Sequence, residues 1–260
     1  MLNEKPHVLV LSGLDPSGGA GIQADIQAIT ALGCHPLPVL TCLTVQDTRN
    51  VYGAEPVDAD LIHRQLLHLE ADTPIHAIKT GALGDETVIQ ALTEFLDNRE
   101  PIPYVLDPVI KAAGGGELAD EKLIAAMLEQ LFPRASLVTP NGPELTQLGG
   151  NPDETTSAKT LLEYGCGAVL ATGGHGTGEF IENRLFTSDG GDRTWQQPRI
   201  GGEYHGSGCT LAAGISAGMA RGQALEAAIE TGQEFVAASI RSALRVGHGQ
   251  PVPDRSRDHG

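Results

Sequence analysis

The chain has 260 residues, of which 40% are hydrophobic and 19% charged, and its formal net charge is −16 at pH 7. This composition is typical of a folded globular protein, and so strong a negative charge argues against nucleic-acid binding. The sequence holds no run of about 18 apolar residues that could span a membrane. Its first residues, MLNEKPHVLVLSG, lack the features of a signal peptide, so we expect a cytoplasmic protein.

Apolar segments alternate with segments of helical periodicity along the chain. The apolar run at 7–13 predicts a buried strand, and 20–33 has the periodicity of a helix. The segment 35–45 is strand-like, but its two prolines favour a loop at its start. The later predicted elements are a helix at 58–70, a strand from 75, a helix at 85–98, a strand from 103, a helix at 120–132, a strand, turn and short helix over 135–148, a helix at 155–165, a strand and glycine loop over 167–176, a hairpin of 179–188 with 192–200, and helices at 207–220 and 224–244.

This alternation predicts an α/β fold, in which a mostly parallel central sheet carries helices on both faces. The sequence shows no internal repeat and no linker-like stretch, so we expect a single domain over residues 1–260. We expect the last residues, 249–260, to form a loose tail.

Glycine-rich or acidic loops follow six of the predicted strands and turns. They read SGLDPSGGAG, KTGALGD, LDPV, TPNGPE, TGGHGTG and HGSGCT. Because ligands bind at the carboxyl ends of the strands in open α/β sheets, these loops predict one composite site.

The stretch HGSGCTLAAG, residues 205–214, places a glycine turn before a helix of small residues. Gly206 and Gly208 allow several backbone N–H groups to face one concavity, which suits an anion such as phosphate. A plain tight turn is the alternative, and the loop matches neither a Walker A motif nor a dinucleotide fingerprint. Cys209 falls at the helix N-terminus, where the helix dipole is expected to lower the pKa of its thiol and leave it poised to take a proton.

An acidic residue interrupts the apolar face of the helix predicted at 20–33. Asp25 projects within a stripe formed by Ile22, Ile26, Ile29 and Leu32. A carboxylate that faces inward needs partners, which Gln46 could share. Asp25 therefore predicts either recognition of a ligand that offers N–H donors or a structural contact with a neighbouring loop.

Two further acids lie at predicted strand ends, Asp107 in VLDPV and Glu144 in TPNGPE. Beside an anion cradle, such carboxylates suit a magnesium ion carried by a nucleoside triphosphate. Lys79 ends a strand at the same rim, where a lysine is normally solvated. His205 lies beside a glycine and is expected to make polar or structural contacts.

The motifs SGLDPSGGAGIQADIQAITALG, TVQDT, IKTGAL, VLDPV, TPNGPE, TGGHG, HGSGCTLAAGI and VGHG occur in an order that resembles the hydroxymethylpyrimidine/phosphomethylpyrimidine kinases of thiamine biosynthesis. The resemblance runs from about residue 8 to 250 and implies a ribokinase-like fold and a homodimer. It also implies use of Mg²⁺ with ATP, with K⁺ as a further candidate cofactor. The implied acceptors are 4-amino-5-hydroxymethyl-2-methylpyrimidine and then its monophosphate.

The resemblance also implies roles for single residues. It places Asp25, Gln46, Gly13 and Val109 at the aminopyrimidine. The implied anion hole comprises Gly206, Ser207, Gly208 and Cys209, and Cys209 stands where related sugar kinases carry an aspartate base. The implied nucleotide, phosphate and magnesium residues are Asn141, Glu144, Asp107, Thr172 and Gly174, with Asp107 and Glu144 nearest the metal.

Three positions depart from the family pattern: the lysine after the aspartate loop is displaced to Lys111, Thr172 replaces a lysine, and Tyr204 replaces a threonine. Two other readings stay open. One is a pyridoxal or pyridoxine kinase, whose relatives share the GSGC-type hole, and the other is a ligand-binding relative that has lost turnover, which the displaced lysine and Thr172 favour. The pair Asp25 and Gln46 favours the aminopyrimidine, whose exocyclic amine pyridoxal lacks.

Overall fold

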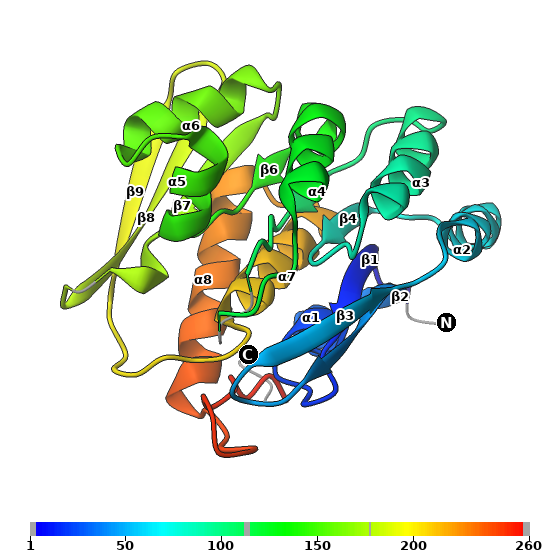
Figure 1. Ribbon diagram of the computed structural model, residues 1–260. Coiled ribbons are helices and arrows are strands. Elements are labelled where there is room, and N and C mark those ends of the chain that lie inside the picture. Colours follow the sequence, from blue (N-terminus) through cyan, green and yellow to red (C-terminus); the bar gives the residue numbers. More distant parts are fainter. Residues whose placement is uncertain (1–3, 112–114, 177, 257–260) are drawn as a thin grey trace.

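The computed structural model describes residues 4–111, 115–176 and 178–256. Within them, one nine-stranded sheet has the order β3-β2-β1-β4-β5-β6-β7-β8-β9 (Figure 1). The run from β2 to β7 is parallel, and β3, β8 and β9 are antiparallel to their neighbours, which confirms the predicted mostly parallel sheet. The strands are β1 (His7–Leu14), β2 (His35–Gln46), β3 (Val51–Pro56), β4 (Ala77–Thr80), β5 (Tyr104–Leu106), β6 (Leu137–Val138), β7 (Ala168–Thr172), β8 (Phe180–Thr187) and β9 (Asp192–Pro198).

Helices cover both faces of the sheet, as the alternation predicts. One face packs on α1 (Gly21–Ala31), α7 (Ser207–Ala220) and α8 (Leu225–Arg241). The other packs on α2 (Ala59–Asp72), α3 (Glu86–Asp97), α4 (Glu121–Ala126), α5 (Gly142–Gly149) and α6 (Glu154–Glu163). In β1, Leu9 and Leu11 belong to the core under α2 and α3, whereas Val8 and Val10 face α1 and α7, because side chains alternate between the two faces of a strand.

The helix α7 is buried on nearly all sides, as its small residues predict. Gly214 and Gly218 permit close packing against α8: a Cβ atom at Gly214 would lie 3.0 Å from the Cα of Gly232, and one at Gly218 would lie 2.9 Å from the Cβ of Ala228. This packing fixes the N-terminus of α7 at the carboxyl ends of β4 and β5, with which α7 is in contact.

The structure corrects three expectations about the elements. β2 is a strand from His35 onward, so its start is not a loop. Pro36 and Pro38 are tolerated there because β3 pairs only with Cys42–Gln46, and no strand on that edge needs an N–H donor from the two prolines. The strand β3 was not expected. The predicted helix 120–132 is α-helical only to Ala126 and continues as a π-helix, Met127–Leu131, followed by a 3₁₀ turn.

The loose tail is a further correction. Residues 249–256 fold back onto the body, where Val252 pairs with Leu244 and Arg255 is only 2% exposed. Residues 257–260 lie outside the described part of the chain. The polar groups of this segment find buried partners, which composition alone did not indicate.

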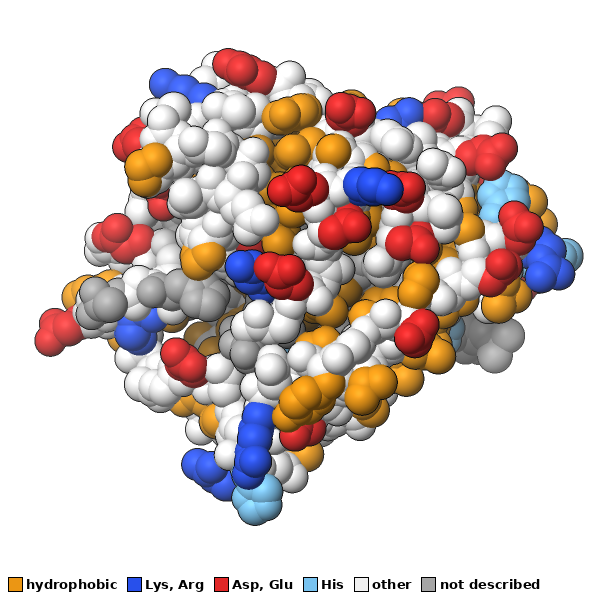
Figure 2. All heavy atoms as spheres, in the orientation of Figure 1, with side chains coloured by type: hydrophobic (Ala, Val, Ile, Leu, Met, Phe, Trp, Pro, Cys, Tyr) orange, Lys and Arg blue, Asp and Glu red, His pale blue; other side chains and the backbone are white. Residues whose placement is uncertain are grey.

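Acidic side chains are scattered over the face seen in Figure 2 rather than gathered into one patch. Among the helices of the described residues, none is both long and apolar enough to cross a membrane.

Candidate active site

The turn before α7 has the geometry of an anion cradle. Gly206 is the N-cap in the left-handed conformation (φ 83°), and no side chain caps the helix. Its carbonyl oxygen accepts the N–H of Thr210 at 3.0 Å. The N–H groups of Ser207, Gly208 and Cys209 precede the first intrahelical bond and have no carbonyl partner in the helix. They are therefore free to bind an anion, although that role stays a prediction.

A buried ion pair lies under this turn. Nζ of Lys79 is 2.9 Å from both carboxylate oxygens of Asp25, and both side chains have no exposed surface. Oδ2 of Asp107, at the end of β5, is 3.9 Å from the same Nζ. Burial alone would lower the pKa of Lys79, but the carboxylates of Asp25 and Asp107 raise it above its ordinary value.

Two expectations about this pair meet different outcomes. Asp25 faces inward, as its place in the apolar stripe predicts. Lys79 is not solvated, so that expectation is wrong: β4 is buried along its whole length, and Asp25 supplies the counter-charge. The expectation that Asp25 contacts an aminopyrimidine directly stays a prediction, since its carboxylate is occupied by Lys79 in this structure.

The thiol of Cys209 belongs to the same cluster. The thiol is half-buried, and the charges of Lys79, Asp107 and Asp25 all act on it. Removal from water raises the pKa of Cys209 to about 12, and the charges of Asp107 and Asp25 add to the rise against the attraction of Lys79. The expected lowering by the helix dipole is therefore wrong, because burial beside two carboxylates outweighs it. At neutral pH the thiol keeps its proton.

Asp107 and Glu144 form a buried acidic pair. Burial raises the pKa of Asp107 to about 6, against the attraction of Lys79. Burial, followed by the negative charge of Asp107, raises the pKa of Glu144 to about 8. Oδ2 of Asp107 is buried and accepts no hydrogen bond. Two carboxyl groups that repel each other, one of which has an oxygen that accepts no hydrogen bond, are suited to binding a divalent cation.

A cation at this pair would need ligands from outside the protein. Across the described residues, no three His, Cys, Asp or Glu side chains are arranged to hold a metal ion. Mg²⁺ commonly binds through one or two carboxylates, water and the phosphates of a substrate. The pair therefore suits magnesium that arrives with a nucleotide.

Glu144 also has a structural task. Its Oε2 accepts the N–H of Asn141 at 2.9 Å, while Oδ1 of Asn141 accepts the N–H of Glu144 at 3.0 Å, which closes a capping box at the start of α5. Oε1 of Glu144 accepts the N–H of Ile110 at 3.4 Å. The motif TPNGPE is thus a helix N-terminus, and the spacing from Asn141 to Glu144 is the signal that could have shown it.

The residues expected at the nucleotide lie beside this helix start. Thr172 ends β7 and forms a bridge with Asn141. Gly174 is exposed, and its carbonyl oxygen accepts a hydrogen bond from Nη1 of Arg199 at 2.7 Å. The displaced Lys111 is exposed and pairs with Glu117 at 3.9 Å, and the hydroxyl of Tyr204 donates to the carbonyl of Gly201.

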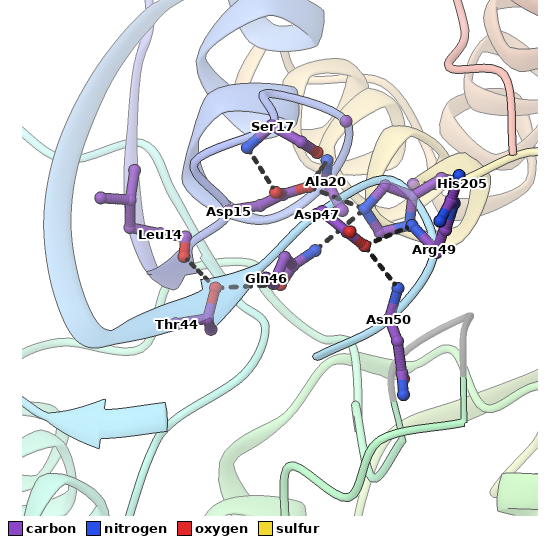
Figure 3. Close-up of polar contacts among 12 residues, drawn as sticks. Leu14, Asp15, Ser17, Ala20, Thr44, Gln46, Asp47, Arg49, Asn50 and His205 are labelled. Carbon is purple, nitrogen blue, oxygen red and sulfur yellow. Dashed lines mark hydrogen bonds and ion pairs between the residues drawn. The ribbon is translucent and has the colours of Figure 1, made fainter. Parts of the chain in front are cut away.

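Gln46 belongs to a second polar cluster, shown in Figure 3, in which His205 lies between Asp15 and Gln46. Nε2 of His205 is 2.7 Å from Oδ2 of Asp15 and 3.1 Å from Nε2 of Gln46. Oε1 of Gln46 accepts the hydroxyl of Thr44 at 2.9 Å. His205 is therefore a polar-contact histidine, as expected, and Gln46 contacts His205 and Thr44 rather than the partner of Asp25.

Asp15 shapes the loop that carries this cluster. Its carboxylate accepts the N–H groups of Ser17 and Ala20, each at 2.8 Å (Figure 3). Burial would raise the pKa of Asp15, but hydrogen bonds from His205 and Ser17 hold it below its ordinary value. The loop therefore holds an ionised carboxylate at the edge of the site.

The last two predicted substrate residues frame the site from the sheet. Gly13 lies in β1, where a Cβ atom would come within 2.6 Å of Sγ of Cys42, so only glycine fits without movement. Val109 follows Asp107 in the loop after β5 and is half-buried. Their contact with a substrate stays a prediction.

Two buried residues of the site, Asp15 and Arg255, were not singled out by sequence reasoning, and the burial of Lys79 was missed. Lys79 stands in the apolar run AIKTGAL, so the test that found Asp25, a charge within an apolar pattern, could also have found it. Nothing local indicates Arg255, whose partners are far away in the sequence.

Comparison with known proteins identifies the family and the fold of this chain. The profile of the family described as phosphomethylpyrimidine kinase matches residues 15–253. The chain belongs to this family. A hydroxymethylpyrimidine/phosphomethylpyrimidine kinase of Streptomyces coelicolor is 34% identical over 263 residues, which cover 98% of this chain and 94% of that protein.

Solved structures of phosphomethylpyrimidine kinases and pyridoxal kinases share the fold. An ADP complex of Bacillus subtilis pyridoxal kinase superposes with a TM-score of 0.88 at 28% identity, covering 97% of this chain and 98% of that one. A phosphomethylpyrimidine kinase of Clostridium difficile superposes with a TM-score of 0.78 at 29% identity, covering 91% and 100%. The chain is thus a ribokinase-like member of a family of small-molecule kinases.

Proposed function

We propose that this kinase transfers a phosphoryl group from ATP to 4-amino-5-hydroxymethyl-2-methylpyrimidine and then to the resulting monophosphate, as a step of thiamine biosynthesis. The observation that carries the proposal is the meeting of the cradle at the start of α7 with two buried acids, Asp107 and Glu144, since α7 contacts β5 and Asp107 directly follows that strand. Phosphoryl transfer needs this combination, because catalysis rests on positioning and on stabilisation of negative charge.

The N–H groups of Ser207, Gly208 and Cys209, with Gly206 as the cap, would hold the transferring phosphoryl group. Asp107 and Glu144 would hold Mg²⁺, which when bound neutralises charge on the phosphates. The nucleotide would lie along Asn141, Thr172 and Gly174, with K⁺ as a further candidate ion. The residues assigned to magnesium and to the nucleotide follow the neighbouring strands β5, β6 and β7, so this assignment matches the order of the strands in the sheet.

The acceptor would lie on the other side of the cradle. Gln46 is half-buried and its amide offers both a donor and an acceptor, which match the amine and ring nitrogens of an aminopyrimidine. Gly13 and Val109 would line the ring, and Asp25 would contribute either directly or by holding Lys79 beside Asp107.

A second candidate function, pyridoxal kinase, is favoured by one observation: the pyridoxal kinase superposes with the higher TM-score of the two kinases, 0.88 against 0.78. A relative without turnover is the third reading. It is motivated by the departures at Lys111, Thr172 and Tyr204.

An ATP-consumption assay with three acceptors separates these functions: the aminopyrimidine alcohol, its monophosphate and pyridoxal. We expect the largest kcat/KM with the two pyrimidines, and loss of turnover in excess chelator. Higher kcat/KM with pyridoxal would replace the proposal with the second candidate. Binding of the heterocycles without ATP consumption would support the relative without turnover.

We also propose that the protein acts as a cytoplasmic homodimer. The outer surface of β2 and β3 exposes large apolar side chains: Leu43 (46%), Val45 (63%) and Tyr52 (65%). Figure 2 shows hydrophobic side chains along this part of the molecule. Sedimentation velocity should give the mass of a dimer for the wild type and of a monomer for Val45→Glu, and a monomeric wild type would refute the assignment.

A further inference from the structure

The segment after α8 connects three loops of the candidate site. We call residues 247–255 the C-terminal strap. The N–H of Gly249 donates to Oγ1 of Thr48 at 2.9 Å, and that of Gln250 donates to the carbonyl of Thr48 at 3.0 Å. The carbonyl of Pro251 accepts the N–H of His205 at 3.0 Å. The strap thus joins the turn between β2 and β3 to the turn before α7.

Arg255 anchors the end of this strap and is 2% exposed. Its Nε donates to Oγ1 of Thr210 at 2.7 Å, and its Nη2 donates to the carbonyl of Gly19 at 2.6 Å and that of Gly206 at 3.4 Å. Nη1 donates to Oε1 of Gln27 at 3.3 Å. All four acceptors are neutral, and among the described residues no carboxylate lies within 4.0 Å of its guanidinium nitrogens.

A buried guanidinium without an ion pair is unusual, because removal of a charge from water is costly. Burial lowers the pKa of Arg255, while the charges of Asp25 and Asp15 favour its protonated form. An arginine side chain keeps its proton in proteins. Arg255 is therefore a fixed positive charge between the two polar clusters, the one at Asp25 and the one at Asp15.

The loop at Gly19 and the turn at Gly206 meet backbone to backbone. A Cβ atom at Gly206 would lie 2.0 Å from the carbonyl oxygen of Gly19 and 2.8 Å from Nη2 of Arg255. The same Nη2 binds the carbonyls of both glycines. One planar, forked side chain thus fixes the relative placement of two loops from opposite ends of the chain.

We propose that Arg255 is a positioning residue for phosphoryl transfer, which holds the loop at residues 15–20 and the turn at Gly206 together so that the N–H groups at the start of α7 face the transferring group. This inference rests on the proposed kinase function. It assigns a role to a residue outside the motifs on which that function was built.

Kinetics of Arg255→Ala test the proposal. Misplacing a catalytic group by about 1 Å can lower the reaction rate by about 10²-fold. We therefore expect kcat to fall by about 10²-fold, while KM for the pyrimidine stays within a few-fold of the wild-type value. Millimolar guanidinium ion should restore at least about tenfold of the lost rate, since it returns the missing fork. The matched control is Arg221→Ala, which removes an exposed guanidinium that donates to the carbonyl of Leu32 at the other end of α7; its kcat should not change.

Hydrogen exchange supplies a readout that needs no substrate. In Arg255→Ala, the hydrogen-bonded amides of Ser17, Gly18, Ala20 and Thr210 should exchange at least about tenfold faster, with no such change in Arg221→Ala. Wild-type exchange rates in Arg255→Ala would overturn the positioning role, whatever the substrate. If the wild type turns over no pyrimidine but the exchange changes as expected, the proposed function fails and the positioning role stands.

A second variant keeps the test decisive if Arg255→Ala does not fold. Arg255→Lys keeps the charge but cannot bind Thr210, Gly19 and Gly206 with one planar group. We expect an intermediate loss of kcat and faster exchange of the same amides. A lysine variant with wild-type kcat and exchange would show that the charge alone matters, and would overturn the role of the fork.

Discussion

Asp25 and Lys79 are two buried charges, each of which depends on the other. Asp25→Asn would leave the ammonium of Lys79 buried with only Asp107, 3.9 Å away, as a counter-charge. Breaking one half of a buried pair costs about 3–5 kcal/mol, so we expect the free energy of unfolding in urea to fall by about that amount. The double variant Asp25→Asn/Lys79→Met should recover most of it.

The double variant also isolates the substrate contact. If Asp25 binds the aminopyrimidine, KM should rise by about one to two orders of magnitude even with stability restored, since an unmet hydrogen bond costs about 1–3 kcal/mol. A double variant no more stable than Asp25→Asn alone would contradict the mutual dependence of the pair.

Cys209 holds its proton at neutral pH, because burial raises the pKa of its thiol to about 12. A protonated thiol cannot act as a general base, whose help is typically worth about 10²–10⁴-fold. We therefore expect Cys209→Ala to slow both phosphorylations by less than about tenfold, because the backbone N–H groups of the cradle remain. Single-turnover rates with each acceptor measure this.

The comparison between the two acceptors would expose a base role. The alcohol must lose a proton as it attacks, whereas the second acceptor is a phosphate monoester with a second pKa of about 6 and is largely ionised. A loss of about 10²-fold confined to the alcohol would therefore show that Cys209 does take the proton.

The start of α7 requires glycine at position 206 but not at position 208. Gly206→Ala places a side chain in the left-handed region and against the carbonyl of Gly19. Such strain costs about 1–3 kcal/mol, so we expect a loss of unfolding free energy of at least about 2 kcal/mol. Gly208→Ala, where a Cβ atom would meet nothing within 4 Å, should not lower it. Chemical denaturation of both variants checks the contrast, and equal stabilities would refute it.

The elements that sequence reasoning found are those whose signal is local. The apolar run of β1, the periodicity of α1 and the small residues of α7 each dictate their own structure. β2 was misjudged at its start because two prolines disfavour a strand in general, yet an unpaired edge tolerates them. That edge is a property of the whole sheet and cannot be read from the segment.

The free protein as a whole should lose stability as pH rises. Burial and the charge of Asp107 raise the pKa of Glu144 from 4.5 to about 8 in the folded protein, and burial raises that of Asp107 to about 6. Between pH 4.5 and about pH 8 the folded state binds more protons than the unfolded state, so the free energy of unfolding falls as pH rises. We expect a decrease on the order of 3 kcal/mol between pH 5 and pH 8.

Calorimetric Tm values of the free protein across this range provide the measurement. Glu144→Gln keeps one oxygen acceptor but cannot titrate, so its Tm should depend on pH much less steeply. A wild-type Tm that rises from pH 5 to pH 8 would contradict the raised pKa values of the pair.

Some features of the candidate site can be recognised from the sequence, whereas others depend on contacts between distant parts of the chain. Asp25 could be found from the sequence because it breaks a pattern, and the glycine turn at Gly206 because its spacing is specific. The pairing of Asp25 with Lys79, the shift in the pKa of Cys209 and the anchor at Arg255 depend on residues brought together only by the fold.

The contact between Arg255 and Gly19 joins residues 236 positions apart. During synthesis the loop at Gly19 leaves the ribosome long before its anchor. A nascent chain that has already formed its sheet still lacks the support that Arg255 gives to the turn at Gly206. For the same reason, we expect cleavage before Arg255 to slow the proposed phosphoryl transfer by about 10²-fold, as in Arg255→Ala, while leaving the sheet intact.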